Sequence, residues 1–195
     1  MNAVRPRLSA EVIISFRRER FTHAFAELIL ERGYRRVTVG DVVAAARSSR
    51  SGFYECFANK EDAFLALLTE GFDDLRVVVE TACTAAGDGS GVRMQAGLGA
   101  ALEWVSDNPA RAHACLTEAP AAGPRCLERQ YAFRDCLAAL LVAAAPARPS
   151  RPPMTAELVV GGLISLVAGR LLSAGPQSVL ELEPELLQYM LEPYS

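Results

Sequence analysis

A run of arginine, serine and tyrosine side chains in the first third of the chain is suited to binding nucleic acid. Arg47, Ser48, Ser49, Arg50 and Ser51 follow one another, and a tyrosine comes three residues later. Guanidinium and hydroxyl groups donate hydrogen bonds to phosphate oxygens and to base edges. We expect these five residues to face phosphates and bases. The hydroxyl of Tyr54, which the core does not need, is expected to reach a phosphate.

Two short helices joined by a tight turn would position these groups. Thr38 is a typical N-cap for the first helix, and Asp41, three residues later, completes a capping box. Arg47 and Ser48 form the turn, and the second helix is expected at about Ser49 to Phe57. This is a helix-turn-helix arrangement, in which the second helix enters the major groove of DNA.

The charge distribution along the chain supports a nucleic-acid partner. Residues 1–60 contain eleven Lys/Arg and six Asp/Glu, a balance of +5, whereas residues 61–195 contain nine Arg and seventeen Asp/Glu, a balance of −8. A basic N-terminal segment followed by an acidic remainder is typical of a DNA-binding domain attached to a domain that does not touch phosphates.

The remaining sequence predicts helices and no strands. Apolar residues recur at steps of three and four, Ala and Leu dominate, and no alternating apolar run appears. Gly33 is expected to end a first long helix, and a Pro-rich linker is expected at 145–153. We predict an all-α fold of about nine helices, divided into a three-helix DNA-binding domain at 1–60 and a helical domain at 61–195.

The helix-turn-helix region resembles the DNA-binding domain of the TetR family. That family typically shows T-x-x-x-I/V-A-x-x-A-G-V-S-x-x-x-F/Y-Y-x-H-F-x-x-K-E-x-L after a helix that ends in Gly-Tyr/Phe. The residues in register with this pattern are Thr38, Val42, Ala46, Ser49, Phe53, Tyr54, Phe57, Lys60 and Glu61.

The resemblance implies a role for each matching polar residue. Thr38 would cap its helix and also touch a phosphate, and Lys60 would meet a phosphate from the start of the fourth helix. Tyr54 would bind a third phosphate. The residues expected in the major groove are Ser49, Arg50 and Ser51.

Three residues depart from the family pattern. Arg47 stands where the turn usually has glycine, Cys56 stands where histidine is usual, and Gly52 lies inside the recognition helix. Glycine weakens a helix by up to about 1 kcal/mol relative to alanine. These departures affect base preference and the shape of the turn, and they remove no phosphate-binding group.

The second domain is expected to bind a ligand and to dimerise. The resemblance implies a cavity for a small apolar or amphipathic effector, with contacts from Met94, Leu98, Trp104, His113, Tyr131 and Phe133. The helix expected at about 155–174 is too apolar to face water, so we expect it to form a homodimer interface together with the last helix, at about 180–192. The interface residues expected are Leu163, Leu166, Arg170, Leu171, Leu187 and Met190.

Several functional classes are not supported by the sequence. The five cysteines lack CxxC spacing and the two histidines lack ligand spacing, so we expect free thiols, no metal and no cofactor. No nucleophile elbow or phosphate-binding glycine loop points to an enzyme, and no catalytic residue is assigned. The apolar run is short for a membrane span and contains Arg170.

The combined expectation is a cytoplasmic, ligand-responsive repressor. It would bind double-stranded palindromic operator DNA as a homodimer, and a mostly apolar effector would release it. The alternatives are a helical interaction module and a transcriptional activator without ligand-triggered release. The alternative for the six residues expected to contact the ligand is that they only pack in the hydrophobic core and that no ligand binds.

Overall fold

The structure is a computed structural model that describes residues 10–145 and 154–191. Every regular element in these ranges is helical, which confirms the all-α prediction. Most of the predicted linker, residues 146–153, lies outside the described residues. The head consists of the elements α1 (Ala10–Arg32), η1 (Tyr34–Arg36), α2 (Val39–Ala45) and α3 (Arg50–Cys56).

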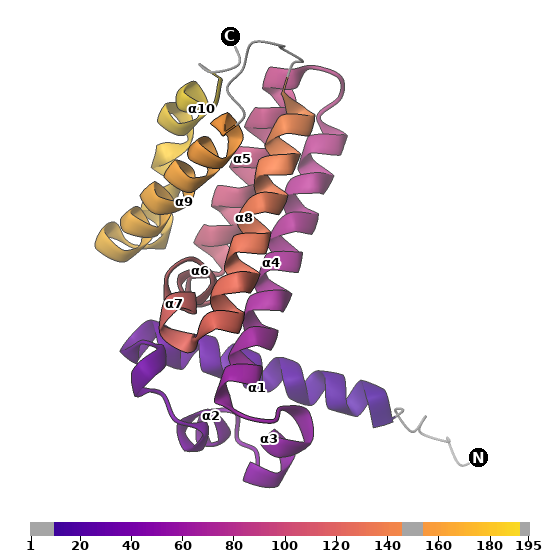
Figure 1. Cartoon of the computed structure of the whole chain (residues 1–195), viewed down its shortest axis with the longest axis vertical. Helices are drawn as coiled ribbons and strands as arrows, with labels where there is room; N and C mark the ends of the chain where they lie inside the picture. The colour runs from indigo at the N-terminus through magenta and orange to yellow at the C-terminus, as the bar shows by residue number, and fades with distance from the viewer. Residues whose placement is uncertain (1–9, 146–153, 192–195) are drawn as a thin grey trace, which may run out of the picture.

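Longer helices build the body. Figure 1 shows α4, α5 and α8 running side by side along the long axis, with α9 and α10 against one flank. The elements are α4 (Lys60–Ala85), α5 (Ser90–Asp107), α6 (Pro109–His113), η2 (Ala114–Glu118), α7 (Ala119–Ala122), α8 (Pro124–Ala144), α9 (Thr155–Ala174), η3 (Pro176–Leu182) and α10 (Glu183–Leu191).

The segment between α5 and α8 is more divided than the sequence predicted. Pro109 starts α6 as expected, but the helix then passes through the π-helical turn η2 before α7. A π turn shifts the helical register, and such turns are common at functional sites. This division is the reason that the described residues contain ten α-helical segments instead of about nine.

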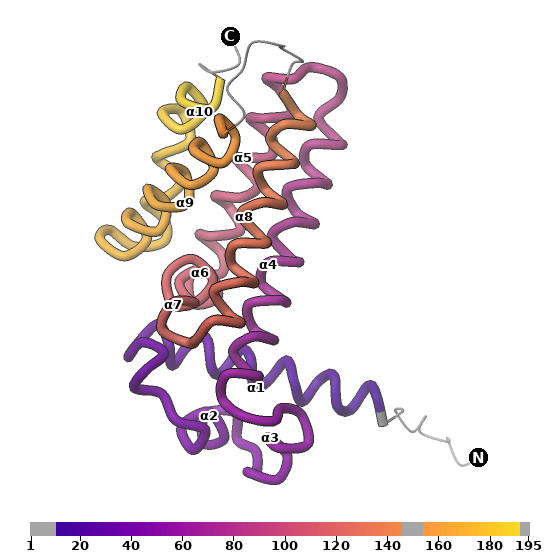
Figure 2. The backbone as a smooth tube through the Cα atoms, viewed as in Figure 1, coloured from indigo at the N-terminus to yellow at the C-terminus, as the bar shows by residue number. Residues whose placement is uncertain are grey.

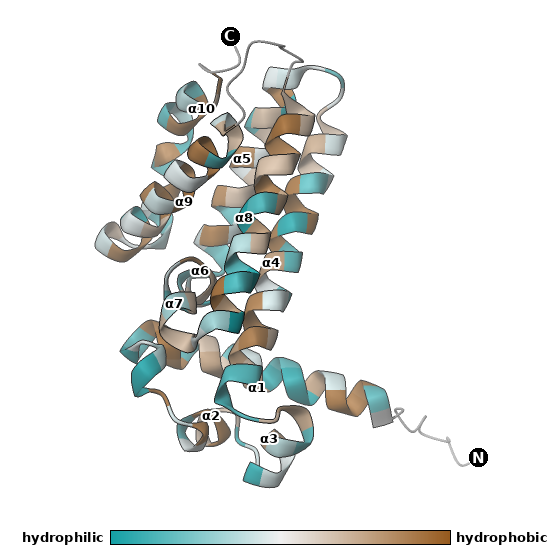
Figure 3. Ribbon diagram, viewed as in Figure 1, coloured by the Kyte–Doolittle hydropathy of each residue, from teal (hydrophilic) through white to brown (hydrophobic). Residues whose placement is uncertain are grey.

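Helix α4 connects the two parts of the molecule. It begins at the head and continues without interruption into the body, as the tube in Figure 2 shows. Figure 3 shows hydrophobic and hydrophilic residues interleaved along α4 and α8, the pattern of helices with one buried face. Phe72 of α4 stacks on Phe133 of α8, with ring centroids 4.3 Å apart.

Aromatic side chains form the core of the head. Phe53 of α3 lies edge-on to Phe21 of α1 at 5.4 Å between centroids, and Phe57 packs beside both. Tyr34 of η1 packs against Phe64 of α4 at 4.8 Å. Because these rings are fully or almost fully buried, they fix the orientation of α3 on α1 and α4.

Candidate nucleic-acid interface and effector cavity

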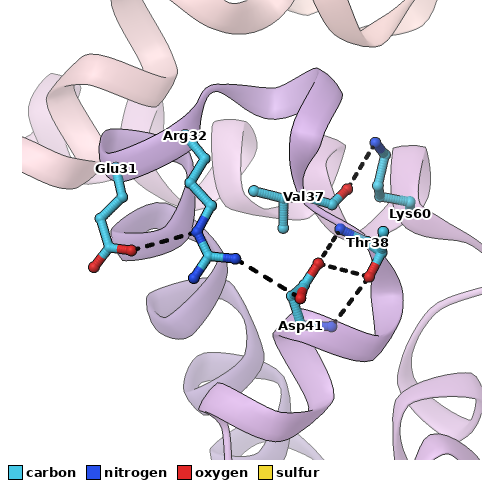
Figure 4. A network of polar contacts seen from close by, with 6 residues as sticks. All are labelled: Glu31, Arg32, Val37, Thr38, Asp41 and Lys60. Carbon is cyan, nitrogen blue, oxygen red and sulfur yellow. Dashed lines mark hydrogen bonds and ion pairs between the residues drawn. The ribbon is translucent and has the colours of Figure 1, made fainter.

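The first helix of the helix-turn-helix starts at the predicted cap. Thr38 Oγ1 accepts a hydrogen bond from the Asp41 backbone N–H at 3.2 Å, and the Asp41 carboxylate accepts one from the Thr38 N–H at 2.8 Å. These two bonds form the capping box, drawn in Figure 4. The Thr38 hydroxyl also donates to the Asp41 carboxylate at 2.6 Å, and this bond together with the one from the Thr38 N–H holds the pKa of Asp41 below its usual value.

The turn between α2 and α3 is made by a residue in the left-handed region. Arg47 has a φ of 47°, and among the described residues it is the one non-glycine residue with positive φ. This region costs an L-residue about 1–2 kcal/mol, which explains why glycine is usual at the equivalent family position. The turn therefore keeps its geometry despite the arginine.

Helix α3 has one buried face and one exposed polar face. Gly52, Phe53 and Cys56 point into the head, whereas Arg50, Ser51 and Tyr54 share the opposite side and are exposed. Ser49 caps the helix by accepting a 3.0 Å hydrogen bond from the Gly52 N–H.

Gly52 has a packing reason that the sequence did not reveal. A Cβ at this position would lie 3.2 Å from Ser49 Oγ and 3.3 Å from Ser48 Oγ, with Arg17 of α1 close by at 3.6 Å. The absence of a side chain at Gly52 leaves room for the hydroxyls of Ser48 and Ser49 and for Arg17 of α1. This close packing offsets the low helix propensity of glycine.

Three arginines of α1 hold the ends of the short helices, a role that sequence reasoning missed. Arg20 donates to the Ala46 carbonyl at the end of α2, and Arg18 donates to the Cys56 carbonyl at the end of α3 at 2.6 Å. Arg17 pairs with Glu55. Cations at helix C-termini satisfy the last carbonyls and complement the helix dipole. Part of the basic charge of the head is therefore structural.

Lys60 points inward, toward backbone carbonyls. Its ammonium donates to the Tyr34 carbonyl at 3.1 Å and to the Val37 carbonyl at 3.0 Å, and it lies 4.0 Å from the centre of the Tyr34 ring (Figure 4 shows the Val37 bond). Burial lowers the pKa of Lys60. Two of its three donors are used internally, so this geometry favours a structural role over the phosphate contact expected from the family pattern.

Cys56 lies in a site suited to packing. Burial raises the pKa of its thiol, and the opposing effect of Arg17 and Arg18 is smaller. Because the thiolate is the reactive form, a raised pKa makes this cysteine a poor redox sensor. All five cysteines are free.

The body contains an apolar cavity of about 130 Å³ between α4, α5, α8 and α9. Three of the six predicted ligand contacts line it, namely Met94, Leu98 and Phe133. The walls also include residues that sequence reasoning did not assign to a ligand, among them Leu75, Leu116, Leu140 and Ile164. Their contribution depends on how four helices meet, and periodicity cannot show that.

The other three predicted contacts do not line this cavity. Tyr131 is exposed, because it lies two residues from Phe133 and so points to the opposite side of α8. Trp104 is buried on another side of α5. His113 is buried beside Glu118, with 3.9 Å between its Nε2 and the carboxylate.

The predicted dimer residues fall into two groups. Leu166 is 54% exposed, and Arg170 is paired with Glu181 at 3.7 Å. In contrast, Leu171 and Met190 are buried within the chain, and Leu163 and Met190 line the cavity. These residues face the body because α9 packs on α8 and α10 packs on α5. An apolar residue on α9 or α10 can therefore belong to the core of one chain instead of a dimer interface. Leu187 is half-buried against the core.

The outer face of α9 is apolar and carries small residues. Leu158 and Leu172 are exposed beside Leu166, and Gly162 and Gly169 have open space around them. Within the described residues, α9 is the one helix long and apolar enough to cross a membrane by length and composition. The sequence had suggested a subunit interface for this helix instead.

Comparison with known proteins found one matching family model and several solved structures with a similar fold. Residues 22–67 match the family model of the bacterial regulatory proteins of the tetR family. The fatty acid degradation regulator FadR from Bacillus halodurans has a similar structure, with a TM-score of 0.79 at 15% identity, over 96% of this chain and 97% of that chain. No curated protein matches the sequence.

Two further solved structures are similar. FadR from Bacillus subtilis, in complex with stearoyl-CoA, gives a TM-score of 0.76 at 13% identity, over 91% of this chain and 99% of that one. PfmR, a TetR-family regulator from Thermus thermophilus, gives 0.68 at 18% identity, over 88% and 97%. Residues 22–67 thus match the family model of the tetR-family regulatory proteins, and the described residues have the fold of solved TetR-family transcriptional regulators.

Proposed function

We propose that this regulator is a cytoplasmic repressor that binds a palindromic operator as a homodimer and is released by a small, mostly apolar effector. The proposal rests on one observation, which is that α4 extends from the head to the wall of the cavity. Its first turn contacts η1 and the connection that leads into α2, and two turns of the same helix, at Leu75 and Val79, line the apolar cavity. A ligand in the cavity can therefore act on the head through one rigid element.

The proposed DNA contacts come from the exposed face of the helix-turn-helix. Arg50 and Ser51 would enter the major groove with Ser49, and Tyr54, which is 55% exposed, would bind a phosphate. Thr38, Arg47 and Ser48 would contact the backbone on either side. The domains would divide at residue 60, where α4 begins.

The proposed dimer forms through the outer face of α9, with α10 at its side. An exposed row of leucine and glycine residues on a 20-residue helix is costly in water, and a second copy would cover it by a two-fold arrangement of four helices. Such a dimer would hold two recognition helices about 34–36 Å apart, the spacing of successive major-groove sites.

The proposed effector is apolar because the cavity wall is apolar. The wall consists almost entirely of aliphatic side chains with Phe133, so it offers little to orient a highly charged molecule. The structural similarity to a regulator solved with stearoyl-CoA supports an effector with a long apolar portion. Ligand binding and operator binding would oppose each other reciprocally.

Selection of bound DNA from a random pool tests the proposal. The expected product is a palindrome whose half-sites are about one helical turn apart or a multiple of it. A thermal-shift screen of apolar compounds should yield a ligand that raises the melting temperature and lowers operator affinity. Selected sites without two-fold symmetry, or a stabilising ligand that leaves operator affinity unchanged, would contradict the proposal.

A further inference from the structure

The side chain of Arg50 crosses from one short helix of the head to the other. Arg50 is the first residue of α3, and Gly40 is the second residue of α2, the helix that lies beside it in Figure 1. The Nη2 atom of Arg50 lies 3.4 Å from the position that a Cβ would occupy at Gly40. Thr38 Oγ1 lies 3.5 Å from the same point. The guanidinium of the recognition helix therefore lies against the first turn of α2.

Arg50 lies there without an acceptor among the described residues. It is exposed, and it forms no hydrogen bond or ion pair with any residue that the structure describes. The neighbouring Thr38 hydroxyl is already used, because it donates to the Asp41 carboxylate at 2.6 Å and accepts from the Asp41 N–H at 3.2 Å. The donors of the Arg50 guanidinium are therefore free to bind a group outside the chain, such as the edge of a base.

Glycine at position 40 is explained by this side chain and not by the backbone. Gly40 is not one of the glycines with positive φ, so an L-residue could adopt its conformation. Glycine inside a helix costs up to about 1 kcal/mol relative to alanine. A Cβ alone would make an ordinary van der Waals contact with Arg50, whereas the further atoms of a longer side chain would compete with the guanidinium for the same space. Gly40 thus keeps the place of the guanidinium open.

We infer that Gly40 is a specificity-determining residue that acts by positioning Arg50, and that the base read by Arg50 is guanine. The inference rests on the proposed major-groove role of Arg50 and adds the residue that places its side chain. Guanine presents the acceptors O6 and N7 in the major groove, and arginine donates to both of them in the commonest specific contact. A long side chain that already lies against α2 loses less conformational freedom when it binds a base.

The competing explanation is that Arg50 is a solvated charge and that Gly40 only weakens α2. In that case a larger residue at position 40 would stabilise the helix and leave base preference unchanged. Two substitutions separate the explanations. Gly40→Ala adds only the tolerated Cβ, whereas Gly40→Gln extends into the place of the guanidinium. Both new residues have a higher helix propensity than glycine, so neither variant should have a lower melting temperature than the wild type.

Selection of bound duplex DNA from a random pool, with full-length variants, tests the inference. The wild type and Gly40→Ala should select a half-site with a guanine that Arg50→Ala no longer prefers. Gly40→Gln should reduce the preference for this guanine by about tenfold, the discrimination expected from one bidentate contact. Ala45→Gln is the matched control, because Ala45 is exposed on α2, and it should keep the preference.

A double variant tests whether Gly40 acts through Arg50. Gly40→Gln combined with Arg50→Ala should have the same base preference as Arg50→Ala alone, since the side chain that glutamine displaces is then absent. A glutamine that contacted a base directly would instead change the preference in both backgrounds. Melting temperatures at or above the wild-type value would show that the variants at position 40 are folded.

Three results would overturn the inference. They are a Gly40→Gln protein that keeps the guanine preference, a glutamine effect that persists in the Arg50→Ala background, and an Arg50-dependent base other than guanine. Failure of the proposed role of Arg50 is a different result, in which Arg50→Ala selects the same sites as the wild type. Failure of the proposed DNA binding would leave no duplex selected by the wild type.

Discussion

The backbone N–H of Tyr34 donates a 2.9 Å hydrogen bond to Oε2 of Glu118. This bond joins η1 of the head to η2 of the body across 84 residues of sequence. Glu118 lies two residues beyond Leu116, which lines the cavity, and its other oxygen is 3.9 Å from His113. The head is therefore connected to the cavity wall by η2 as well as by α4.

Replacing Glu118 should weaken the connection between head and body. Glu118→Ala leaves the Tyr34 N–H without its acceptor, so we expect a loss of about 1–3 kcal/mol in the free energy of unfolding. Glu118→Gln keeps an oxygen acceptor and should lose less. Urea denaturation measures both, with Glu128→Ala on the exposed side of α8 as the control. Equal losses for the alanine and glutamine variants would show that the hydrogen bond contributes little.

Acid should destabilise the protein through His113. Burial lowers the pKa of this imidazole below its usual 6.5, and the smaller opposing effect of Glu118 does not reverse the shift. The unfolded chain therefore takes up the proton first as pH falls. The stability from neutral His113 is present above about pH 6.5 and is lost as the pH falls from there toward the lowered pKa.

Thermal melts at several pH values between about 7.5 and 5.5, on either side of the ordinary histidine pKa, check this expectation. The melting temperature of the wild type should fall over this interval, and that of His113→Gln should fall less. His23→Gln provides the matched control, because His23 is exposed on α1. A fall that is unchanged in His113→Gln would assign the pH dependence to other groups.

Tyr54 and Lys60 should differ in their effect on DNA binding. Tyr54→Phe removes an exposed, uncharged hydroxyl, so it should weaken binding on all sequences. It should leave the salt slope, which is the slope of the logarithm of the binding constant against the logarithm of the salt concentration, nearly unchanged, because only charged groups release counterions. Lys60→Met removes two hydrogen bonds to carbonyls of the connection before α2. It should therefore lower the melting temperature and leave the salt slope unchanged.

Binding isotherms at several salt concentrations separate these effects. Arg50→Ala should additionally relax base preference, since its side chain is expected in the major groove. If the Lys60→Met variant had wild-type stability and a reduced salt slope, the result would support the phosphate contact of Lys60 that the family pattern implies.

Arg47→Gly should stabilise the turn between α2 and α3. Glycine adopts positive φ freely, whereas alanine retains the steric cost of this conformation. We expect the glycine variant to be about 1 kcal/mol more stable than Arg47→Ala in denaturant unfolding. Both variants lose the same side chain, so the comparison cancels any contact of the guanidinium. Equal stabilities would mean that the turn relaxes to accommodate alanine.

Leu166 and Leu171 should give different results when replaced by glutamate. Leu166 is exposed on the outer face of α9, so Leu166→Glu should yield a folded monomer with weak operator binding. Leu171 is 6% exposed and inside the body, so Leu171→Glu should unfold the protein or lower its melting temperature strongly. Sedimentation and circular dichroism distinguish the two outcomes. A wild-type monomer in sedimentation would refute the dimer.

The local features of the head could be read from the sequence. The capping box at Thr38, the exposed polar face of α3 and the buried pair Phe53 and Phe57 all follow from periods of three and four residues. They depend on neighbours within one or two helical turns, so a sequence window contains the necessary information. The charge of residues 1–60 correctly indicated a basic head, although it did not separate structural arginines from exposed ones.

The contacts between distant segments were decided by the tertiary structure. Lys60 was expected to bind a phosphate, yet its ammonium faces the carbonyls of Tyr34 and Val37, because the first turn of α4 lies next to η1 and the connection that follows it. Apolar periodicity could not tell whether Leu171 faces the body or a second subunit, since burial by either has the same pattern. The sequence determined which faces of the helices are apolar, and the packing of four helices determined which of those faces enclose a cavity and which remain uncovered.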